Sequence, residues 1–313
     1  GFIGIQMMIS SILSSSYREI GRVRVILVIT LIAAGSNAFL NWVFIYGHLG
    51  MPRLEVEGAA YATIIAKTVE MLLLIGYTIK ERPEFISFSV FKRIDWALFG
   101  RILKKGSLLI ISQMMWVLSE SFTAAIYNGR GNAAVVSGMA ASFSIANLFF
   151  ISFDGITTAT GVLIGKSLGR NELDDARKEK TWMLSAAIIF GCIMCLVGVV
   201  TVLLVPVVFG NLSIDAQNIC RAMLLLMALF MPLWTFVNTQ LAVCRAGGDT
   251  KVGFLVDGGT TAVMIPMLLI LAFFTNASPV MMYFGVKALD VGKIIVATHE
   301  MKKERWVVNL SNA

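Results

Sequence analysis

The chain has 313 residues, of which 57% are hydrophobic and only 14% are charged, and its formal net charge is +7. Soluble domains carry about 25% charged residues, so this composition excludes an ordinary soluble domain and indicates a polytopic membrane protein. We expect no nucleic-acid binding, because the distribution of the basic residues between loops explains the positive charge.

Apolar runs predict a partial span at residues 1–16, followed by eight complete membrane-spanning helices of an all-α protein. The complete spans lie near residues 25–46, 58–79, 108–127, 134–165, 182–209, 219–243, 253–274 and 280–298. The chain opens on the apolar stretch Gly1-Phe2-Ile3-Gly4, which suggests that the natural N-terminus lies further upstream.

The loops between these spans alternate in charge. One set holds twenty lysines and arginines, whereas the other set holds only Arg53 and Arg130. Cytoplasmic loops are the basic ones, so this alternation predicts a multi-pass protein of the cell membrane with its C-terminus in the cytoplasm.

One basic loop, residues 80–106, is longer than the others and rich in aromatic residues. Such a segment is typical of an amphipathic helix in the membrane interface. We therefore divide the chain into a first bundle (1–79), a cytoplasmic linker (80–106) and a second bundle with its tail (107–313). A weak repeat relates residues 17–25 to residues 244–252, and two similar bundles in tandem are typical of transporters.

Glu120 lies near the middle of the span at residues 108–127. A charged group at that depth costs at least roughly 2.5–3.5 kcal/mol, so a retained acid favours an ion or substrate pathway. The alternative is a carboxylate that is protonated, or hydrogen-bonded to a neighbouring helix, and serves packing only.

Four groups of short patterns follow one another along the chain: Ser36-Asn37-x3-Asn41 with Gly47-x2-Gly50-Met51-Pro52, Gly161-x3-Gly165-Lys166, Cys244-Arg245-Ala246-Gly247-Gly248-Asp249-Thr250, and Lys303-x-Arg305-Trp306. In this order and with this topology they resemble the multidrug and toxic compound extrusion (MATE) transporters of the MOP superfamily, in particular a bacterial branch common in Firmicutes. The resemblance runs from the end of the family's fourth helix to its twelfth.

The resemblance implies a two-lobe transporter of twelve helices, of which this chain lacks roughly the first three and a half. The expected function is export of small cationic, drug-like compounds in exchange for H⁺ or Na⁺, by rocking between two open states in the bacterial inner membrane. It implies no cofactor beyond the coupling ion, and we expect a monomer.

Glu120 corresponds to a glutamate of the family's seventh helix that is implicated in cation coupling, and it is a candidate Na⁺ ligand. A carboxylate in a low-dielectric environment favours its protonated form, so it can also exchange a proton for a cationic drug. Three further acids are candidates for coupling or substrate binding: Asp154, Asp257 and Asp249. For Asp249, capping of the next helix is the alternative role.

Asn37, Asn41 and Thr63 form a candidate polar cluster of the first bundle, and interhelical hydrogen bonding is their alternative role. Met115 and Trp116, close to Glu120 in sequence, are candidates for lining a drug cavity.

Spacings of three residues predict charge pairing within spans. The expected pairs are Lys67–Glu70, Lys287–Asp290 and Asp290–Lys293, with a gate between the lobes as the alternative role of the last three residues.

Two other functions stay open. A lipid-linked oligosaccharide or peptidoglycan-precursor flippase of the same superfamily would need several cavity arginines, and of the basic residues within spans only Arg221 is an arginine. An intramembrane enzyme would need a histidine, a serine dyad, a metal cluster or paired aspartates at mid-depth. The sequence offers none of these convincingly, so we expect no enzymatic activity.

Overall fold

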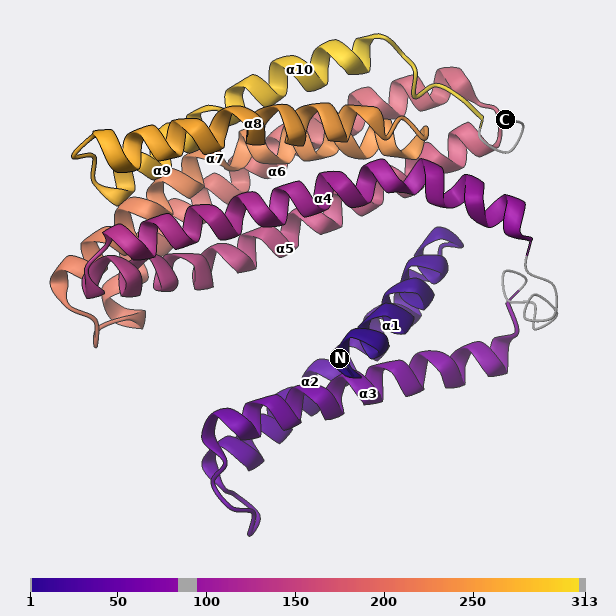
Figure 1. Cartoon of the computed structure of the whole chain (residues 1–313). Helices are drawn as coiled ribbons and strands as arrows, with labels where there is room; N and C mark the ends of the chain where they lie inside the picture. The colour runs from indigo at the N-terminus through magenta and orange to yellow at the C-terminus, as the bar shows by residue number, and fades with distance from the viewer. Residues whose placement is uncertain (1, 84–94, 310–313) are drawn as a thin grey trace. The chain divides into compact units, whose positions relative to one another are not determined.

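A computed structural model describes residues 2–83 and 95–309, and every element in this part of the chain is helical (Figure 1). The helices are α1 (Phe2–Glu19), α2 (Val23–Tyr46), α3 (Glu55–Glu81), α4 (Trp96–Arg130), α5 (Ala133–Gly169), α6 (Leu173–Val208), α7 (Ile214–Ala246), α8 (Lys251–Phe274), α9 (Pro279–Ala288) and α10 (Asp290–Lys302). The predicted all-α fold is thereby confirmed.

Seven helices of the described part, α2 to α8, are long and apolar enough to cross a membrane. Even the shorter ones, of 24 residues, extend beyond a hydrocarbon core of about 30 Å at a rise of 1.5 Å per residue. They match seven of the eight complete spans predicted from sequence. The eighth, near residues 280–298, is divided between α9 and α10, which meet at Leu289.

Polar side chains fix where several of these helices begin. The side chain of Asn132 accepts a hydrogen bond from the backbone N–H of Val135 at the start of α5. Ser213 and Ser278 cap α7 and α9 in the same way. Each cap satisfies a backbone N–H that has no partner within its own helix.

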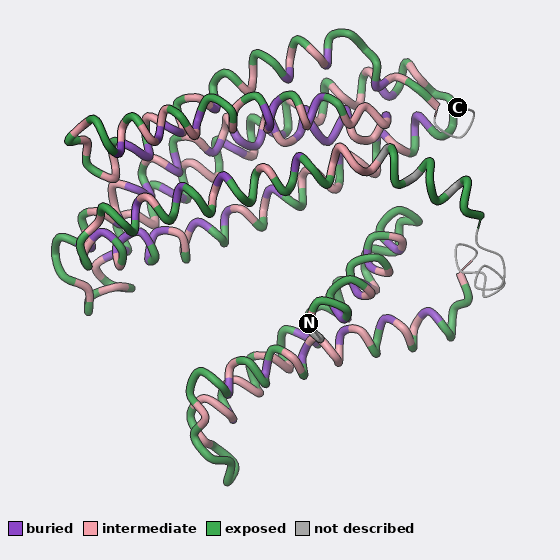
Figure 2. The backbone as a smooth tube through the Cα atoms, in the orientation of Figure 1, coloured by how far each residue is buried: buried purple, intermediate pink, exposed green. Residues whose placement is uncertain are grey.

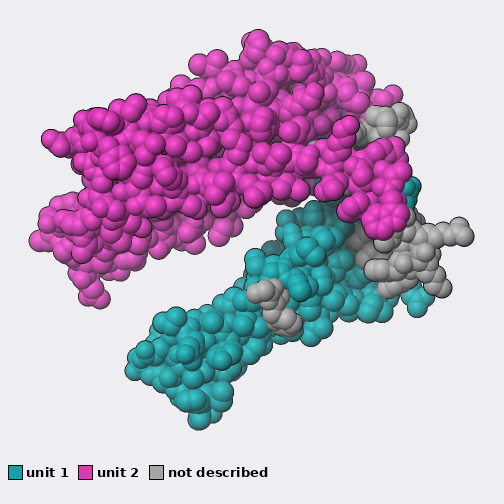
Figure 3. All heavy atoms as spheres, viewed as in Figure 1, with its two compact units in different colours: residues 1–95 teal, residues 96–313 magenta. Residues whose placement is uncertain are grey.

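The chain divides into two compact units, residues 1–95 and residues 96–313 (Figure 3). Residues 84–94 of the predicted linker (80–106) lie outside the described residues, while its first two residues end α3 and residues 96–106 begin α4. In the first unit, α2 packs against α3 around a small apolar cluster that includes Tyr17, Ile29 and Leu74. α1 adds a buried polar contact, because Gln6 donates to Thr68 on α3 over 2.6 Å.

In the second unit, α7 is the central helix and contacts α5, α6, α9 and α10. The main core lies between α5, α7, α8 and α9, and its buried positions alternate with exposed ones along each helix (Figure 2). It includes Met223, Met227 and Met231 at the four-residue spacing of one helix face.

Candidate transport site

An ion pair joins α4 to α9. The ammonium of Lys287 donates to Oε1 of Glu120 over 2.8 Å, and the Lys287 side chain is only 14% exposed, against 34% for that of Glu120. Glu120 lies mid-way along an apolar span, as predicted, but its partner is 167 residues away in the sequence. The carboxylate is therefore neutralised by a cation that the protein itself supplies.

Two aromatic rings complete the environment of Lys287. Its ammonium lies 5.4 Å from the ring centroid of Tyr283 and 5.7 Å from that of Trp234, and both rings are buried. Aromatic faces attract cations at such distances, most strongly where water is excluded. The site therefore combines one carboxylate with two rings, which is a suitable environment for an ammonium group.

The break between α9 and α10 places two opposite charges at helix ends. Lys287 lies in the last turn of α9, and Asp290 is the first residue of α10. Cations are favoured at helix C-termini and anions at N-termini, so the dipoles of both helices stabilise these charges. Discontinuous helices with ionisable residues at the break are a recurrent way to build ion sites in transporters.

Asp290 is buried and has two partners. It accepts a hydrogen bond from the indole nitrogen of Trp234 over 2.8 Å and forms an ion pair with Lys293 at 3.1 Å. The predicted Asp290–Lys293 pair is thus confirmed. The predicted Lys287–Asp290 pair is wrong, because Lys287 forms its ion pair with Glu120 instead.

A groove between α4, α8, α9 and α10 brings several candidates together. The residues that line it are Trp116, Ser119, Glu120, Asp257, Thr260, Thr261, Met264, Val286, Lys287, Asp290 and Lys293. Asp257 accepts a hydrogen bond from the buried hydroxyl of Ser112 over 2.7 Å. Three carboxylates and several hydroxyls therefore line one groove, but among the described residues no three His, Cys, Asp or Glu side chains are grouped closely enough to hold a metal ion.

Other candidates lie elsewhere in the second unit. Asp154 is exposed on α5 and does not line this groove. The expected capping role of Asp249 is not found, because α8 begins after Thr250 without a side-chain cap. Met115 lies against Gly258, whose Cβ position would be 3.5 Å from the methionine methyl group. Of the two cavity candidates, only Trp116 lines the groove.

The polar residues of the first unit form local contacts. Asn41 donates to Asn37 over 3.0 Å along α2, and Thr63 donates to the carbonyl of Ala59 in its own helix. The predicted pair of Lys67 with Glu70 is confirmed at 2.7 Å.

Sequence reasoning missed Trp234, Tyr283 and Ser112. Tyr283 precedes Lys287 by four residues, a spacing that places both on one helix face, so its contact could have been inferred. Trp234 and Ser112 have no comparable local signal, because their partners lie on other helices.

Comparisons with known proteins agree with this architecture. The MatE family profile matches residues 109–270, which is more than half of the chain. The chain belongs to the MATE family. It is 26% identical over 291 residues to a probable multidrug resistance protein NorM from Mesorhizobium japonicum, covering 89% of this chain and 61% of that relative. A protein of the same description from Listeria innocua is 24% identical over 312 residues, covering 97% and 67%.

Solved MATE structures have the same fold. A Vibrio cholerae MATE transporter in the bent form superposes with a TM-score of 0.70 at 17% identity, covering 91% of this chain and 64% of that chain. An outward-facing MATE family transporter of the MOP superfamily gives 0.73 at 18% identity, covering 89% and 61%. The chain is thus a multi-pass membrane protein of the MATE type, and it spans about three fifths of the length of the first of these relatives.

Proposed function

We propose that the protein takes part in secondary antiport, exporting cationic organic compounds from the cell in exchange for H⁺ or Na⁺ by alternating access. Glu120 is the acid through which substrate and ion compete, and the protein acts in the bacterial inner membrane with its C-terminus in the cytoplasm. Asp257 and Asp290 are the further acids of the same groove. The polar residues Asn37, Asn41 and Thr63 are retained as candidates for the first unit, and Asp154 and Asp249 as candidates outside the groove.

The Glu120–Lys287 ion pair carries this proposal. A buried charge left without a partner is strongly unfavourable, and breaking a fully buried pair costs about 3–5 kcal/mol; this pair is only partly buried, so its cost is a fraction of that. A transported cation can therefore displace Lys287 only if it replaces the lost interaction with Glu120. The site therefore binds a cation in exchange for the ammonium of Lys287, and the Glu120 carboxylate is paired before the cation binds.

Asp290 is an alternative partner for the displaced ammonium of Lys287. Asp290 lines the same groove as Lys287, and the rings of Trp234 and Tyr283 lie close by. If Lys287 moved from Glu120 towards Asp290, the C-terminal end of α9 and the start of α10 would change their contacts when the cation binds. Because the two helices meet at Leu289, this movement supplies a link between cation binding and helix rearrangement.

The flippase alternative receives less support from the same contacts. A pyrophosphate needs free cations in the cavity, but Lys67, Lys287 and Lys293 are each paired with an acid within 3.1 Å. Arg221 does not line the groove. Anion binding would have to break these pairs, whereas cation binding uses the carboxylates directly.

The test is efflux of a fluorescent cationic dye from proteoliposomes under imposed Na⁺ or H⁺ gradients. We expect one gradient to drive efflux and the Glu120→Gln variant to lose it. The Lys287→Met variant should bind the dye more tightly, because its carboxylate has no internal competitor, and should keep the dependence on the gradient, because dye and ion still compete for Glu120. The control is Lys67→Met, which also removes an ammonium from a span and should leave coupling through Glu120 intact.

Efflux that survives in Glu120→Gln would move the coupling role to Asp257 or Asp290. An unchanged dye affinity in Lys287→Met would refute exchange with the internal ammonium. Absence of dye transport under both gradients, in a well-folded protein, would make lipid-linked precursors the substrates to test next.

A further inference from the structure

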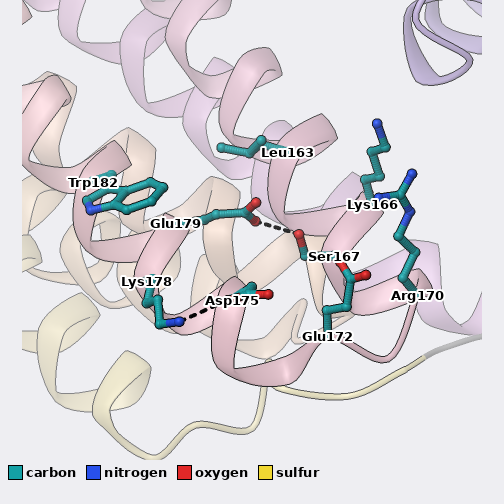
Figure 4. A pocket seen from close by; sticks show the side chains of 9 residues that line it. All are labelled: Leu163, Lys166, Ser167, Arg170, Glu172, Asp175, Lys178, Glu179 and Trp182. Carbon is teal, nitrogen blue, oxygen red and sulfur yellow. Dashed lines mark hydrogen bonds and ion pairs between the residues drawn. The ribbon is translucent and has the colours of Figure 1, made fainter.

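A hollow lies between the end of α5 and the start of α6, away from the transport groove (Figure 4). Lys166 lines it from the last turn of α5 and Arg170 from the residue after that helix, and Glu172, Glu179 and Trp182 line it from α6 and the residue before it. Lys166 and Arg170 lie together on one side, and Trp182 lies beyond Glu179 on the other (Figure 4). The transport function uses none of these residues.

The charges in this hollow are only partly paired. Lys178 forms an ion pair with Asp175 at 3.0 Å, and the buried hydroxyl of Ser167 donates to Glu179 over 2.7 Å. Within the described part of the chain, no ion pair involves the other two cations or the other two carboxylates of the hollow: Lys166, Arg170, Glu172 and Glu179. Two positive and two negative groups therefore face one opening, and their charges sum to zero.

The hollow continues into an apolar face of α6. Trp182, which is 66% exposed, begins a series of exposed hydrophobic side chains with spacings of three, four or seven residues. The series continues with Ile189, Ile193, Leu196, Val200, Leu203 and Val207. α6 is also the most hydrophobic of the seven candidate spans. These spacings place one face of the helix along the acyl chains of the bilayer, with Trp182 at the level of the interface.

We propose that this hollow binds the headgroup of a zwitterionic phospholipid with a primary ammonium, of the phosphatidylethanolamine type. The phosphate lies between Lys166 and Arg170, because guanidinium and ammonium groups are the usual protein ligands of phosphate. The ammonium of the lipid lies between Glu172 and Glu179, and the acyl chains follow the apolar face of α6 below Trp182. The site is independent of the proposed transport function.

The charge pattern distinguishes this headgroup from the other common ones. A purely anionic headgroup would leave Glu172 and Glu179 beside a negative charge without a partner. A choline headgroup has no N–H with which to bind these carboxylates. A headgroup with a phosphate, a hydrogen-bonding ammonium and no further negative charge satisfies both sides of the hollow.

The test is titration of the purified protein by native mass spectrometry with phosphatidylethanolamine, phosphatidylcholine and phosphatidylglycerol that carry the same acyl chains. Glycerophosphoethanolamine, which has the headgroup but no chains, forms a fourth arm. We expect phosphatidylethanolamine to bind roughly tenfold more tightly than the other lipids, as loss of one charge-assisted hydrogen bond implies. The free headgroup should bind far more weakly.

Glu179→Gln and Arg170→Gln should each abolish the preference. The amide oxygen of the first variant still accepts the hydrogen bond from Ser167, so the fold of the hairpin is retained, and equal melting temperatures would verify this. Asp174→Asn and Lys251→Gln are the matched controls, because both residues are charged and exposed but lie outside the hollow. Equal affinities for the three lipids, tight binding of the chain-free headgroup, or loss of the preference in the controls would each overturn the proposal.

Discussion

The backbone of Trp306 lies directly against Gly247, with no room for a side chain between them. A Cβ on Gly247 would lie 2.5 Å from the carbonyl carbon of Trp306 and closer still to its oxygen. Gly247 follows α7 and Trp306 follows α10, and the indole of Trp306 is fully buried. This contact attaches the segment after α10 to the turn between α7 and α8.

Substitution of Gly247 by alanine should therefore be severely destabilising. The added methyl group meets backbone atoms, which cannot rotate away as a side chain can, so we expect a loss of at least about 3 kcal/mol in the free energy of unfolding. Denaturant titration of the purified protein measures this loss. Gly129→Ala, whose Cβ would meet nothing within 4 Å, is the control and should differ little from the wild type.

The interface between α6 and α7 depends on a second glycine. A Cβ on Gly191 would lie 2.5 Å from the Cα of Pro232 and would also overlap the hydroxyl of Thr235. Small residues allow such close approach of helices in membranes. Gly191→Ala should thus lose about 1–3 kcal/mol through overpacking, measured as a fall in the unfolding midpoint.

Its matched control is Gly165→Ala in α5, where the Cβ would enter open space. Alanine favours the helix over glycine by up to about 1 kcal/mol, so this variant should be neutral or slightly stabilised. If both variants lose stability equally, the close approach of α6 and α7 cannot be the cause.

Hydropathy and length made the long helices predictable, because a span of about 20 apolar residues has few alternatives in a bilayer. The charge pairs Lys67–Glu70 and Asp290–Lys293 were predictable too, since both are separated by one helical turn. The helix break at Leu289 was not predictable, because no proline or glycine occurs between Val286 and Asp290 to mark it.

The central contact of the candidate site could not be obtained from sequence. Glu120 was identifiable as an acid within an apolar span, but its partner Lys287 comes from a helix far along the chain, and only tertiary packing brings the two together. The same is true of Trp234, which contacts Lys287 and Asp290 at once. Position within an apolar span therefore identified Glu120, whereas local spacing assigned Lys287 to the wrong partner.

Trp234 should contribute to stability through its hydrogen bond to Asp290. Trp234→Phe keeps an aromatic ring near Lys287 but removes the donor to a buried carboxylate, so we expect a loss of about 1.5–3 kcal/mol. Thermal unfolding of the purified variant measures it. Trp42→Phe, at an exposed indole stacked on His48, should retain the wild-type melting temperature; a similar loss there would point to a general effect of removing an indole.

The hydrogen bond from Ser112 to Asp257 should link α4 to α8 energetically. A double-mutant cycle with Ser112→Ala and Asp257→Asn isolates their interaction, and we expect a coupling energy of about 1.5–3 kcal/mol because the acceptor is charged and the donor is buried. The matched cycle pairs Asp257→Asn with Ser107→Ala, whose hydroxyl donates within its own helix to Lys104. That cycle should give less than about 0.5 kcal/mol, as independent sites do. A coupling equally small for Ser112 would mean that the hydroxyl and the carboxylate do not interact in the folded protein.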